Sequence, residues 1–522
     1  MPDALLDALI YAILLAPLGA VLCVGLGARA HRPRRALDAI TIGFSAVSIL
    51  ASLLLAAGSE GQFPRTSSVF FVDELSAYFL LLVNLVAFFA AWYVPSFLDR
   101  EPQARARTES ANFHISFNLF HFTMVLVPML DNLVLLWMAV EFTTLISTLL
   151  VRYRGDRRAL EAAWKYLTIT TTGIIFALLG TAFLAAAFAS PKATSSTGSV
   201  SIDFSLMSWH QLMTTASKPD LGLVKLAFLF VLVGYGAKAG FAPMHTWLPD
   251  GHGEAPSPVS ALLSGVLLKS ALFAILRFYT LTNQVLKDSA DPDFASSILL
   301  MVGLFSLAIA TPFILKPNRF KRLLAYHSLE HMGIIAFGLG IGGPIAVYGA
   351  LLHALNHALT KALMFLTYGH AQTQYARHRA PAPENPDHEP LHGVLKALPL
   401  HGGLLAAGGL ALVGSPPFNI FQSEFIILWA AVTGSTTPWS ILAVAVFLIT
   451  VTLIFGGLVV HLARLLLGPA PFQIDREGIW ALAPLLMLML IIVVFGFVVP
   501  IWPIDLPGLI QRSVQIVLNT KP

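Results

Sequence analysis

The fold of this chain is decided by residues 238–279, KAGFAPMHTWLPDGHGEAPSPVSALLSGVLLKSALFAILRFY. The stretch leads from the end of one long apolar segment, through a polar turn, into a second apolar segment. Lys238 and Lys269 stand inside these segments, and Gly240 and Pro243, which interrupt helices, follow the first lysine. Because a helix of ~20 apolar residues crosses a bilayer, the stretch predicts two membrane helices, the first one broken, with a lysine in each.

The composition extends this interpretation to the whole chain. Hydrophobic residues make up 56% of the 522 residues and charged residues only 11%, whereas soluble domains carry about 25% charged residues. A bilayer accepts apolar side chains on the outside of a protein. The net charge of +4 comes from basic residues in short loops between apolar runs, so it indicates membrane topology and not nucleic-acid binding.

Apolar segments recur along the chain at the length of a membrane span. They lie near 4–26, 38–57, 75–97, 114–130, 132–151, 163–188, 222–245, 257–282, 295–315, 323–341, 345–369, 399–434, 440–466 and 479–502. The pattern predicts an all-α polytopic membrane protein with about 14 transmembrane helices.

Loop charges predict the orientation of these helices. Basic residues gather after odd-numbered segments, for example Arg29, Arg32, Arg34 and Arg35 after the first, and Arg152, Arg154, Arg157 and Arg158 after the fifth. Because cytoplasmic loops carry the excess of Lys and Arg, we expect both termini on the outer, periplasmic side of a bacterial inner (plasma) membrane.

Two breaks predict an internal repeat. A second interruption, at 414–417 (GSPP), precedes Glu424, and paired broken helices are typical of transporters built from repeats. We expect two inverted five-helix repeats, helices 4–8 and 9–13, with helices 7 and 12 broken. The expected domains are the N-terminal helices 1–3 (1–113), the first repeat (114–282), the second repeat (295–467), and the C-terminal helix 14 with its tail (468–522).

Ionisable side chains inside the predicted spans are the candidate functional residues. Such side chains are costly in lipid and usually face a protein interior or a water-filled path. They are Glu141, Lys165, Lys238, Lys269, His327, His331, His353, His357, Lys361 and Glu424. We predict that the series passes protons stepwise. A single member, however, could be a structural ion pair, and Lys165, near a helix end, could extend to the membrane surface.

Helical spacing places several of these groups on shared faces. The first set is His353, His357 and Lys361. The second set is His327 and His331, and Glu330 lies one residue off the face that these two histidines share. Neutral histidine exchanges protons near physiological pH. Histidines four residues apart are also typical metal ligands, an alternative that stays open. The neighbouring lysine and the lack of a carboxylate within 345–369 favour proton transfer.

The mechanism predicted from these residues is electrostatic. Desolvation disfavours the charged form of a buried lysine, and a nearby carboxylate favours that form. When a proton or a water molecule moves near the lysine, the balance between these two effects changes, and so does the protonation of the lysine. We expect Glu141 to act in this way on Lys165 or Lys238. Asp250 and His252, in the turn after the seventh helix, either cap helices or line a cytoplasmic proton inlet.

These motifs resemble the antiporter-like membrane subunits of respiratory complex I and related complexes. The resemblance covers 72–467. It implies that Lys238 is the central channel lysine, Lys269 the connecting lysine, Glu141 the glutamate of the fifth helix, and Glu424 the terminal ionisable residue of the broken twelfth helix. Glutamate at the last position is similar to the subunit-M branch and not to the subunit-L branch.

Finer motifs resemble the hydrogenase-4 component F group, whose members belong to membrane-bound hydrogenase and formate hydrogenlyase-type complexes. The segments are HSLEHMGIIAFGLGIGG (327–343) and ALLHALNHALTKALMF (350–365). Three residues depart from that group: Gly251 and Gly253 stand where Ala and Ser are expected, and His327 where Ser is usual.

The resemblance implies a proton-translocating subunit of a complex I-like or membrane-bound hydrogenase-type redox complex. Two alternatives stay open: a proton-gradient-driven subunit of an inorganic-carbon uptake complex with a zinc, carbonic-anhydrase-like partner, and a Na⁺/H⁺ antiporter subunit. No phosphate loop, dinucleotide fingerprint or nucleophile elbow occurs in the sequence. We therefore expect no catalytic site, cofactor or metal of its own. The expected partners are redox subunits or the zinc protein, protons and lipids.

Overall fold

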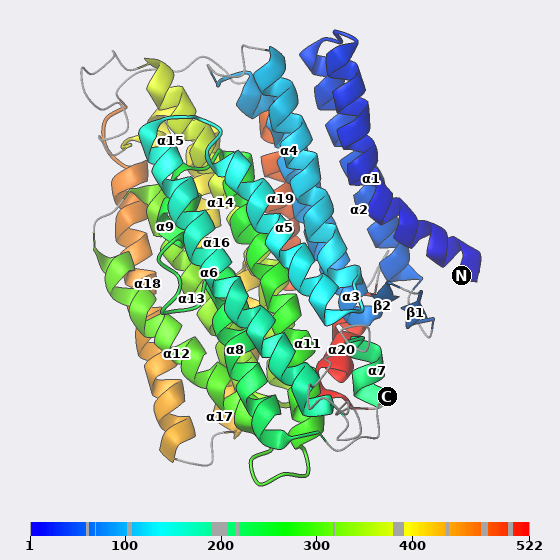
Figure 1. The fold of residues 1–522 in the computed structure, drawn as a ribbon. Helices are drawn as coiled ribbons and strands as arrows, with labels where there is room; N and C mark the ends of the chain where they lie inside the picture. Colours follow the sequence, from blue (N-terminus) through cyan, green and yellow to red (C-terminus); the bar gives the residue numbers. More distant parts are fainter. Residues whose placement is uncertain are drawn as a thin grey trace.

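The computed structural model describes residues 2–58, 62–67, 69–101, 107–189, 207–214, 219–316, 319–378, 391–434, 438–470, 479–498 and 505–520. Helices dominate these residues (Figure 1). A two-stranded antiparallel hairpin, β1 (Arg65–Thr66) and β2 (Phe71–Val72), precedes the third helix.

The helices are α1 (Asp3–Arg29), α2 (Arg34–Ala57), α3 (Glu74–Leu98), α4 (Arg107–Leu126), α5 (Leu133–Val151), α6 (Arg157–Phe188), α7 (Trp209–Thr214), α8 (Leu221–Ala239), α9 (Leu248–Glu254), α10 (Ser257–Leu262), α11 (Leu268–Leu286), α12 (Phe294–Leu315), α13 (Phe320–Ile341), α14 (Gly343–His378), α15 (Val394–Ala397), α16 (Pro399–Leu412), α17 (Asn419–Gly434), α18 (Pro438–Leu466), α19 (Ile479–Phe497) and α20 (Leu506–Leu518). A π-helical turn, Leu263–Leu267, joins α10 to α11. Each predicted apolar segment coincides with one or two of these helices, although 499–502, the end of the last one, lies outside the described residues.

The long helices stand side by side in one bundle, with α1 and α2 at an edge (Figure 1). Within the described residues, nine helices are long and apolar enough to cross a membrane, counting α10 to α11 as one. The most apolar part of that helix is 100% buried, whereas the corresponding part of α12 or α18 is only 39% buried. The α10–α11 helix is therefore the centre of the bundle, and α12 and α18 belong to its periphery.

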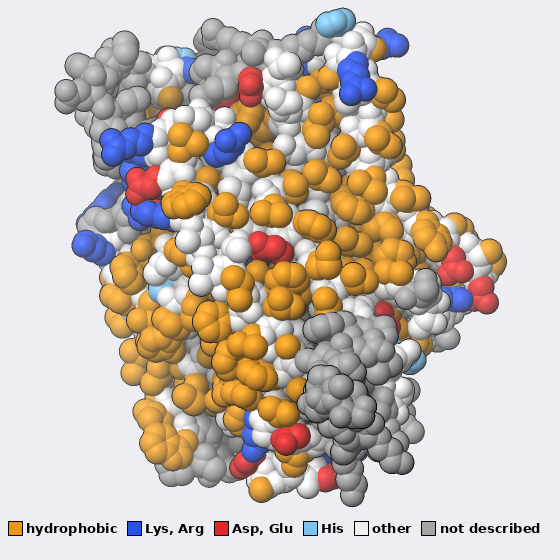
Figure 2. Space-filling view, viewed as in Figure 1, with side chains coloured by type: hydrophobic (Ala, Val, Ile, Leu, Met, Phe, Trp, Pro, Cys, Tyr) orange, Lys and Arg blue, Asp and Glu red, His pale blue; other side chains and the backbone are white. Residues whose placement is uncertain are grey.

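Apolar side chains also cover the outside of the bundle. Figure 2 shows hydrophobic side chains over most of the visible lateral face, with Lys and Arg mainly toward its upper end. Large apolar residues remain exposed on outer helices, for example Trp164 at 69%, Met301 at 65% and Trp439 at 80%. A soluble protein rarely exposes a contiguous apolar surface of this extent, whereas lipid accepts it.

Both predicted helix breaks occur in the structure. Helix α8 ends at Gly240, whose φ of 81° is a left-handed conformation that favours glycine. The second break separates α16 from α17, where Gly414 has a φ of 66°. A Cβ atom on Gly414 would lie 2.2 Å from Oε2 of Glu424. The break therefore also makes room for the carboxylate of Glu424.

Candidate functional site

Lys238 is buried at the end of α8. Its side chain is 0% exposed, and Nζ donates hydrogen bonds to the carbonyl oxygen of Val140 and to Oγ1 of Thr144, both on α5. The break after Ala239 ends α8 directly beyond the lysine. A buried ammonium must be hydrogen-bonded or paired, and α5 supplies both acceptors.

Glu141 reaches Lys238 through a threonine. Its Oε2 lies 3.4 Å from Oγ1 of Thr144, the hydroxyl that also contacts Lys238. Thr171 on α6 donates a second hydrogen bond, of 2.8 Å, to Oε1. Thr144 therefore lies between the carboxylate and the lysine, and Glu141, itself half-buried on α5, remains within electrostatic range of Lys238.

Lys165 does not join this buried pair. Its side chain is 46% exposed and bonds Oε1 of Glu161 at 2.7 Å and Oδ2 of Asp250 at 3.2 Å. Asp250 also bonds Arg322 at 2.8 Å. Of the two partners expected for Glu141, the structure brings Lys238 close and holds Lys165 in a network at the surface.

His252 lies on α9, the same short helix as Asp250 of the surface network. Its ring is 0% exposed and contacts the rings of Trp247 and Phe365, at centroid distances of 5.6 and 5.9 Å. Neither ring nitrogen has a hydrogen-bond partner among the described residues. Because buried polar atoms are nearly always partnered by protein or water, this position is suited to a water molecule.

Lys269 and the histidines of α14 form the middle of the site. Nζ of Lys269 lies 2.6 Å from Nδ1 of His357 and donates to the carbonyl oxygen of Ser264 at 2.9 Å. The Ser264 carbonyl belongs to the π-helical turn, Leu263–Leu267. The ring of His357 lies against that of His331 on α13, with centroids 4.6 Å apart.

A chain of direct contacts continues from His331 to α17. Nδ1 of His331 is 3.0 Å from Nε2 of His353, and Nδ1 of His353 is 3.0 Å from Oγ of Ser423. Ligand atoms of His331, His353 and Glu424 all lie within 4.8 Å of one another. We call Glu141, Lys238, Lys269, His357, His331, His353 and Glu424 the central row.

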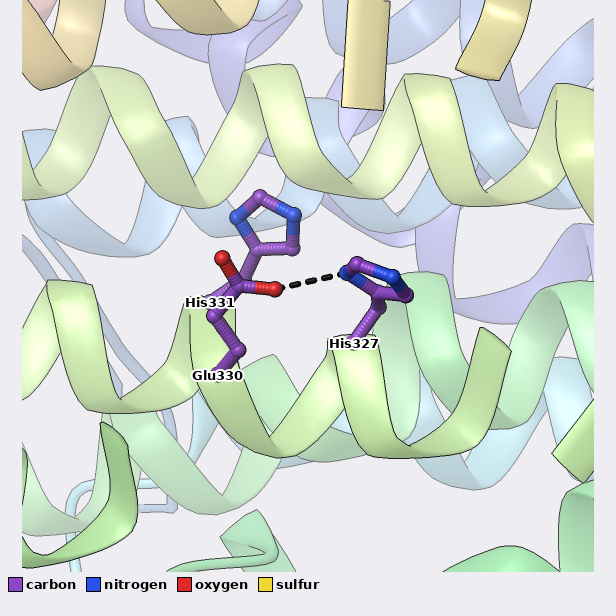
Figure 3. A group of neighbouring side chains, drawn as sticks. All are labelled: His327, Glu330 and His331. Atoms are coloured by element: carbon purple, nitrogen blue, oxygen red, sulfur yellow. Dashed lines mark hydrogen bonds and ion pairs between the residues drawn. The ribbon is translucent and has the colours of Figure 1, made fainter. Parts of the chain in front are cut away.

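A branch leaves the central row on α13 (Figure 3). Nδ1 of His327 and Oε2 of Glu330 are 2.6 Å apart, and both side chains are buried. Glu330, placed by helical spacing one residue off the histidine face, thus pairs with His327. Lys361 on α14 is 0% exposed, donates to the carbonyl oxygen of Leu324, and lies within electrostatic range of Glu330.

The same histidines offer two possible sets of metal ligands. One is His327, Glu330 and His331, and the other is His331, His353 and Glu424. Carboxylates therefore accompany the histidines in space, although 345–369 contains none. Lys269 and Lys361 both act electrostatically on His331. Whenever Lys269 and Lys361 are protonated, they would repel a divalent cation here, so the two lysines favour proton exchange over metal binding.

The central row is interrupted between Lys238 and Lys269. Among the described residues, no hydrogen bond joins Lys238 to Lys269, so the row consists of a short segment around Lys238 and a longer one from Lys269 to Glu424. Sequence reasoning also missed the hydroxyls of Thr144 and Ser423 inside the row. The available clue in the sequence is that each hydroxyl lies within one helical turn of a predicted carboxylate: Thr144 follows Glu141, and Ser423 precedes Glu424.

A buried ion pair beside the central row was also missed. Arg277 on α11 makes a bidentate contact with Asp73, at 2.6 and 2.9 Å, and its guanidinium lies over Trp209 at 4.2 Å. Both side chains are nearly inaccessible. The pair joins the start of α3 to the central helix, and in the described part of the chain neither side chain hydrogen-bonds a member of the row, which indicates a structural role.

The broken helices, the apolar exterior and the buried ionisable row define the class: a multi-pass membrane protein with the architecture of an antiporter-like subunit. The chain belongs to the family described as NADH:quinone oxidoreductase/Mrp antiporter, transmembrane, whose model matches residues 131–453.

Similar proteins agree with this assignment. The chain is 36% identical over 429 residues to a hydrogenase-4 component F homolog of Methylacidiphilum infernorum (isolate V4), covering 81% of this chain and 84% of that protein. It is 28% identical to NADH-quinone oxidoreductase subunit N of Desulforudis audaxviator (strain MP104C), covering 77% and 73%. The fold is similar to a chain of the membrane-bound sulfane sulfur reductase, an archaeal respiratory membrane complex, with a TM-score of 0.79, 20% identity and coverage of 98% and 97%.

Proposed function

We propose that this chain is a proton-translocating membrane subunit of a hydrogenase-4-type redox complex, and that protons pass along the central row. The observation that carries the proposal is the buried succession Lys269, His357, His331 and His353, in which adjacent nitrogens or rings are in direct contact. Neutral imidazole accepts a proton at one nitrogen and releases one from the other, so hydrogen-bonded histidines can relay protons. His357 and His331 are only stacked, and Nε2 of each has no partner among the described residues, so this step of the proposed path needs a bridging water.

The glutamates at the two ends supply the driving charges. Glu141 is coupled to Lys238 through Thr144, and Glu424 adjoins His331 and His353. A change in the charge of either carboxylate alters the stability of the ammonium or imidazolium beside it. Water must close the interval between Lys238 and Lys269, and Asp250 with the unpartnered ring of His252 is the inlet that we propose from the cytoplasm.

Assembly with other subunits follows from the ends of the central row. Both Glu141 and Glu424 are half-buried in the isolated chain, beside the exposed apolar residues Phe142 at 46% and Phe425 at 54%. Lipid is a poor neighbour for a half-exposed carboxylate, so we propose that adjoining subunits cover both. The redox centres belong to those partners.

The proposal includes the architecture that this function needs. We propose fourteen membrane spans, inverted repeats over helices 4–8 and 9–13, and periplasmic termini in a bacterial inner membrane. The two helix breaks at Gly240 and Gly414 support the repeats, and the basic loops after odd-numbered segments support the orientation.

Replacement of Lys238 tests the proposed path. We expect Lys238→Ala to abolish proton uptake by vesicles that contain the complex, because α5 then faces no ammonium, while subunit composition is unchanged. Lys225→Ala is the matched control, since Lys225 lies on the same helix but pairs with Asp291 at the surface. Proton uptake at the wild-type level in Lys238→Ala would remove Lys238 from the path.

Purification of the native complex tests the assignment to a redox system. We expect mass spectrometry to find iron–sulfur subunits together with nickel or flavin subunits. A large zinc protein in their place would assign the chain to inorganic-carbon uptake, and a set of small antiporter subunits alone would assign it to Na⁺/H⁺ exchange.

A further inference from the structure

A second line of buried polar residues runs along α2, outside the central row. Its members recur every three or four residues, which places them on one helix face. They are Asp38, Thr41, Ser45, Ser48 and Ser52, all between 0% and 6% exposed. The distance from the first to the last is about 21 Å along the helix, a large part of the ~30 Å hydrocarbon core of a bilayer.

Neighbouring helices add polar groups to the same line. On α4, Nε2 of His114 lies 2.9 Å from Oδ1 of Asp38, and Nδ1 lies 3.0 Å from Oγ1 of Thr41. Asn118 donates to the same Thr41 hydroxyl at 2.9 Å. We call the five residues of α2, together with His114, Asn118 and His121 of α4 and Asn84 of α3, the N-terminal polar file.

The far end of the file is a second hydrogen-bonded group. Asn84 donates to Oγ of Ser52 at 2.8 Å, and Oδ1 of Asn84 lies 2.7 Å from Nε2 of His121. Ser45 and Ser48 occupy the interval between the two groups. The near end reaches the surface through Arg34, which pairs with Asp38 at 3.6 Å and also with Asp99, whose side chain is 66% exposed.

Unpartnered atoms distinguish this file from a polar contact between helices. Serines often pack at helix interfaces in membranes, but there their hydroxyls usually bond a carbonyl of the same helix. Oγ of Ser45, Oγ of Ser48, Oδ1 of Asn118 and Nδ1 of His121 have no partner among the described residues. All four side chains are at least nine-tenths buried. Unpartnered atoms that follow one another along a single line are suited to bound water.

We propose that the N-terminal polar file is a hydrated, proton-conducting path that connects the Arg34–Asp99 surface with His121. Water bonded to Ser45 and Ser48 would link the Asp38–His114 pair to the Asn84–His121 pair, and imidazole nitrogens at both ends exchange the proton. Helix α3 packs against α2 and also against α10 and α14, so it lies between α2 and the part of the central row that runs from Lys269 to His353. The inference stands independently of the function proposed for that row.

Silver-ion labelling tests whether water reaches the middle of the file. Cys23 is the only cysteine in the sequence, so Cys23→Ser provides a background for Ser45→Cys and Ser48→Cys in the assembled complex. Ala51→Cys is the matched control, because Ala51 is equally buried on α2 but lies off the polar face. A thiol reacts as thiolate and needs a polar surrounding to ionise, so we expect both serine positions to react with Ag⁺ on the order of tenfold faster than Ala51→Cys. Equal rates would mean a dry interface and would overturn the proposal.

A blocking variant tests whether the file is continuous. Hydrogen–deuterium exchange at the imidazole C2 carbon, measured by mass spectrometry, requires water and a ring that exchanges protons. Ser48→Val removes a hydroxyl between the two histidines, so we expect slower exchange at His121 and unchanged exchange at His114, with Ala51→Val as the control. Unchanged exchange at His121 in Ser48→Val would refute a continuous path. If Ser48→Val fails to assemble, the Ag⁺ comparison decides alone.

Discussion

Thr144→Val is the substitution that most directly tests how Glu141 controls Lys238. Valine has the shape of threonine but lacks the hydroxyl that accepts a hydrogen bond from Nζ of Lys238 and lies 3.4 Å from Oε2 of Glu141. Of the acceptors in the described residues, Lys238 then retains the carbonyl oxygen of Val140. The packing of α5 against α6 should change little, so the variant isolates one hydroxyl.

The expected magnitude follows from the burial of the pair. A hydrogen bond to a charged group contributes about 1.5–3 kcal/mol, and Lys238 is 0% exposed, so solvent cannot replace the bond. At 1.36 kcal/mol for each factor of ten, the protonated lysine loses about 10- to 150-fold in population relative to the neutral amine. We expect proton transport to fall by a similar factor if a step through protonated Lys238 limits it.

Proton uptake by inverted membrane vesicles, driven by the native electron donor of the complex, measures this effect. Thr148→Val is the matched control, since the Thr148 hydroxyl bonds only a carbonyl of its own helix, one turn away. Thr144→Ser keeps the hydroxyl and should restore transport. The reasoning fails if Thr144→Val transports protons at the rate of Thr148→Val, because the hydroxyl then carries no part of the coupling.

Three further predictions concern other parts of the site. Glu141→Gln should lower proton uptake by about tenfold or more, because it removes the charge that favours the ammonium of Lys238, and wild-type uptake in vesicles would make that pair structural. Gly414→Ala should displace the carboxylate of Glu424, since its Cβ would lie 2.2 Å from Oε2; proton uptake should fall while Gly403→Ala, at a position with open space, has no effect. Arg277→Met should destabilise the fold by about 3–5 kcal/mol, because it leaves Asp73 buried without its partner; a thermal-unfolding midpoint equal to that of the unmodified complex would contradict this.

The helices, their interruptions and the ionisable residues inside them can be predicted from the order of the amino acids alone. A helix that crosses lipid must be long and apolar, so a charged residue inside such a segment is easily recognised. Gly240 and Gly414 indicate breaks because few other residues tolerate a left-handed backbone. These are local properties, readable without knowledge of which helices touch. The pairing of His353 and His357 on one face of α14 was predictable for the same reason.

Which of these groups contact one another depends on how the helices pack. In the sequence, Lys165 and Lys238 are equal candidates for Glu141. In the structure, α5 and α8 both pack against α6, and Lys238 bonds Thr144 while Lys165 bonds Asp250 at the surface. The serines of α2 carry no charge, so they do not stand out in an apolar segment. The N-terminal polar file forms because His114 of α4 contacts Thr41 of α2 and His121 of α4 contacts Asn84 of α3. Contacts between helices depend on how side chains of distant segments interlock, and no periodicity within a single segment encodes that.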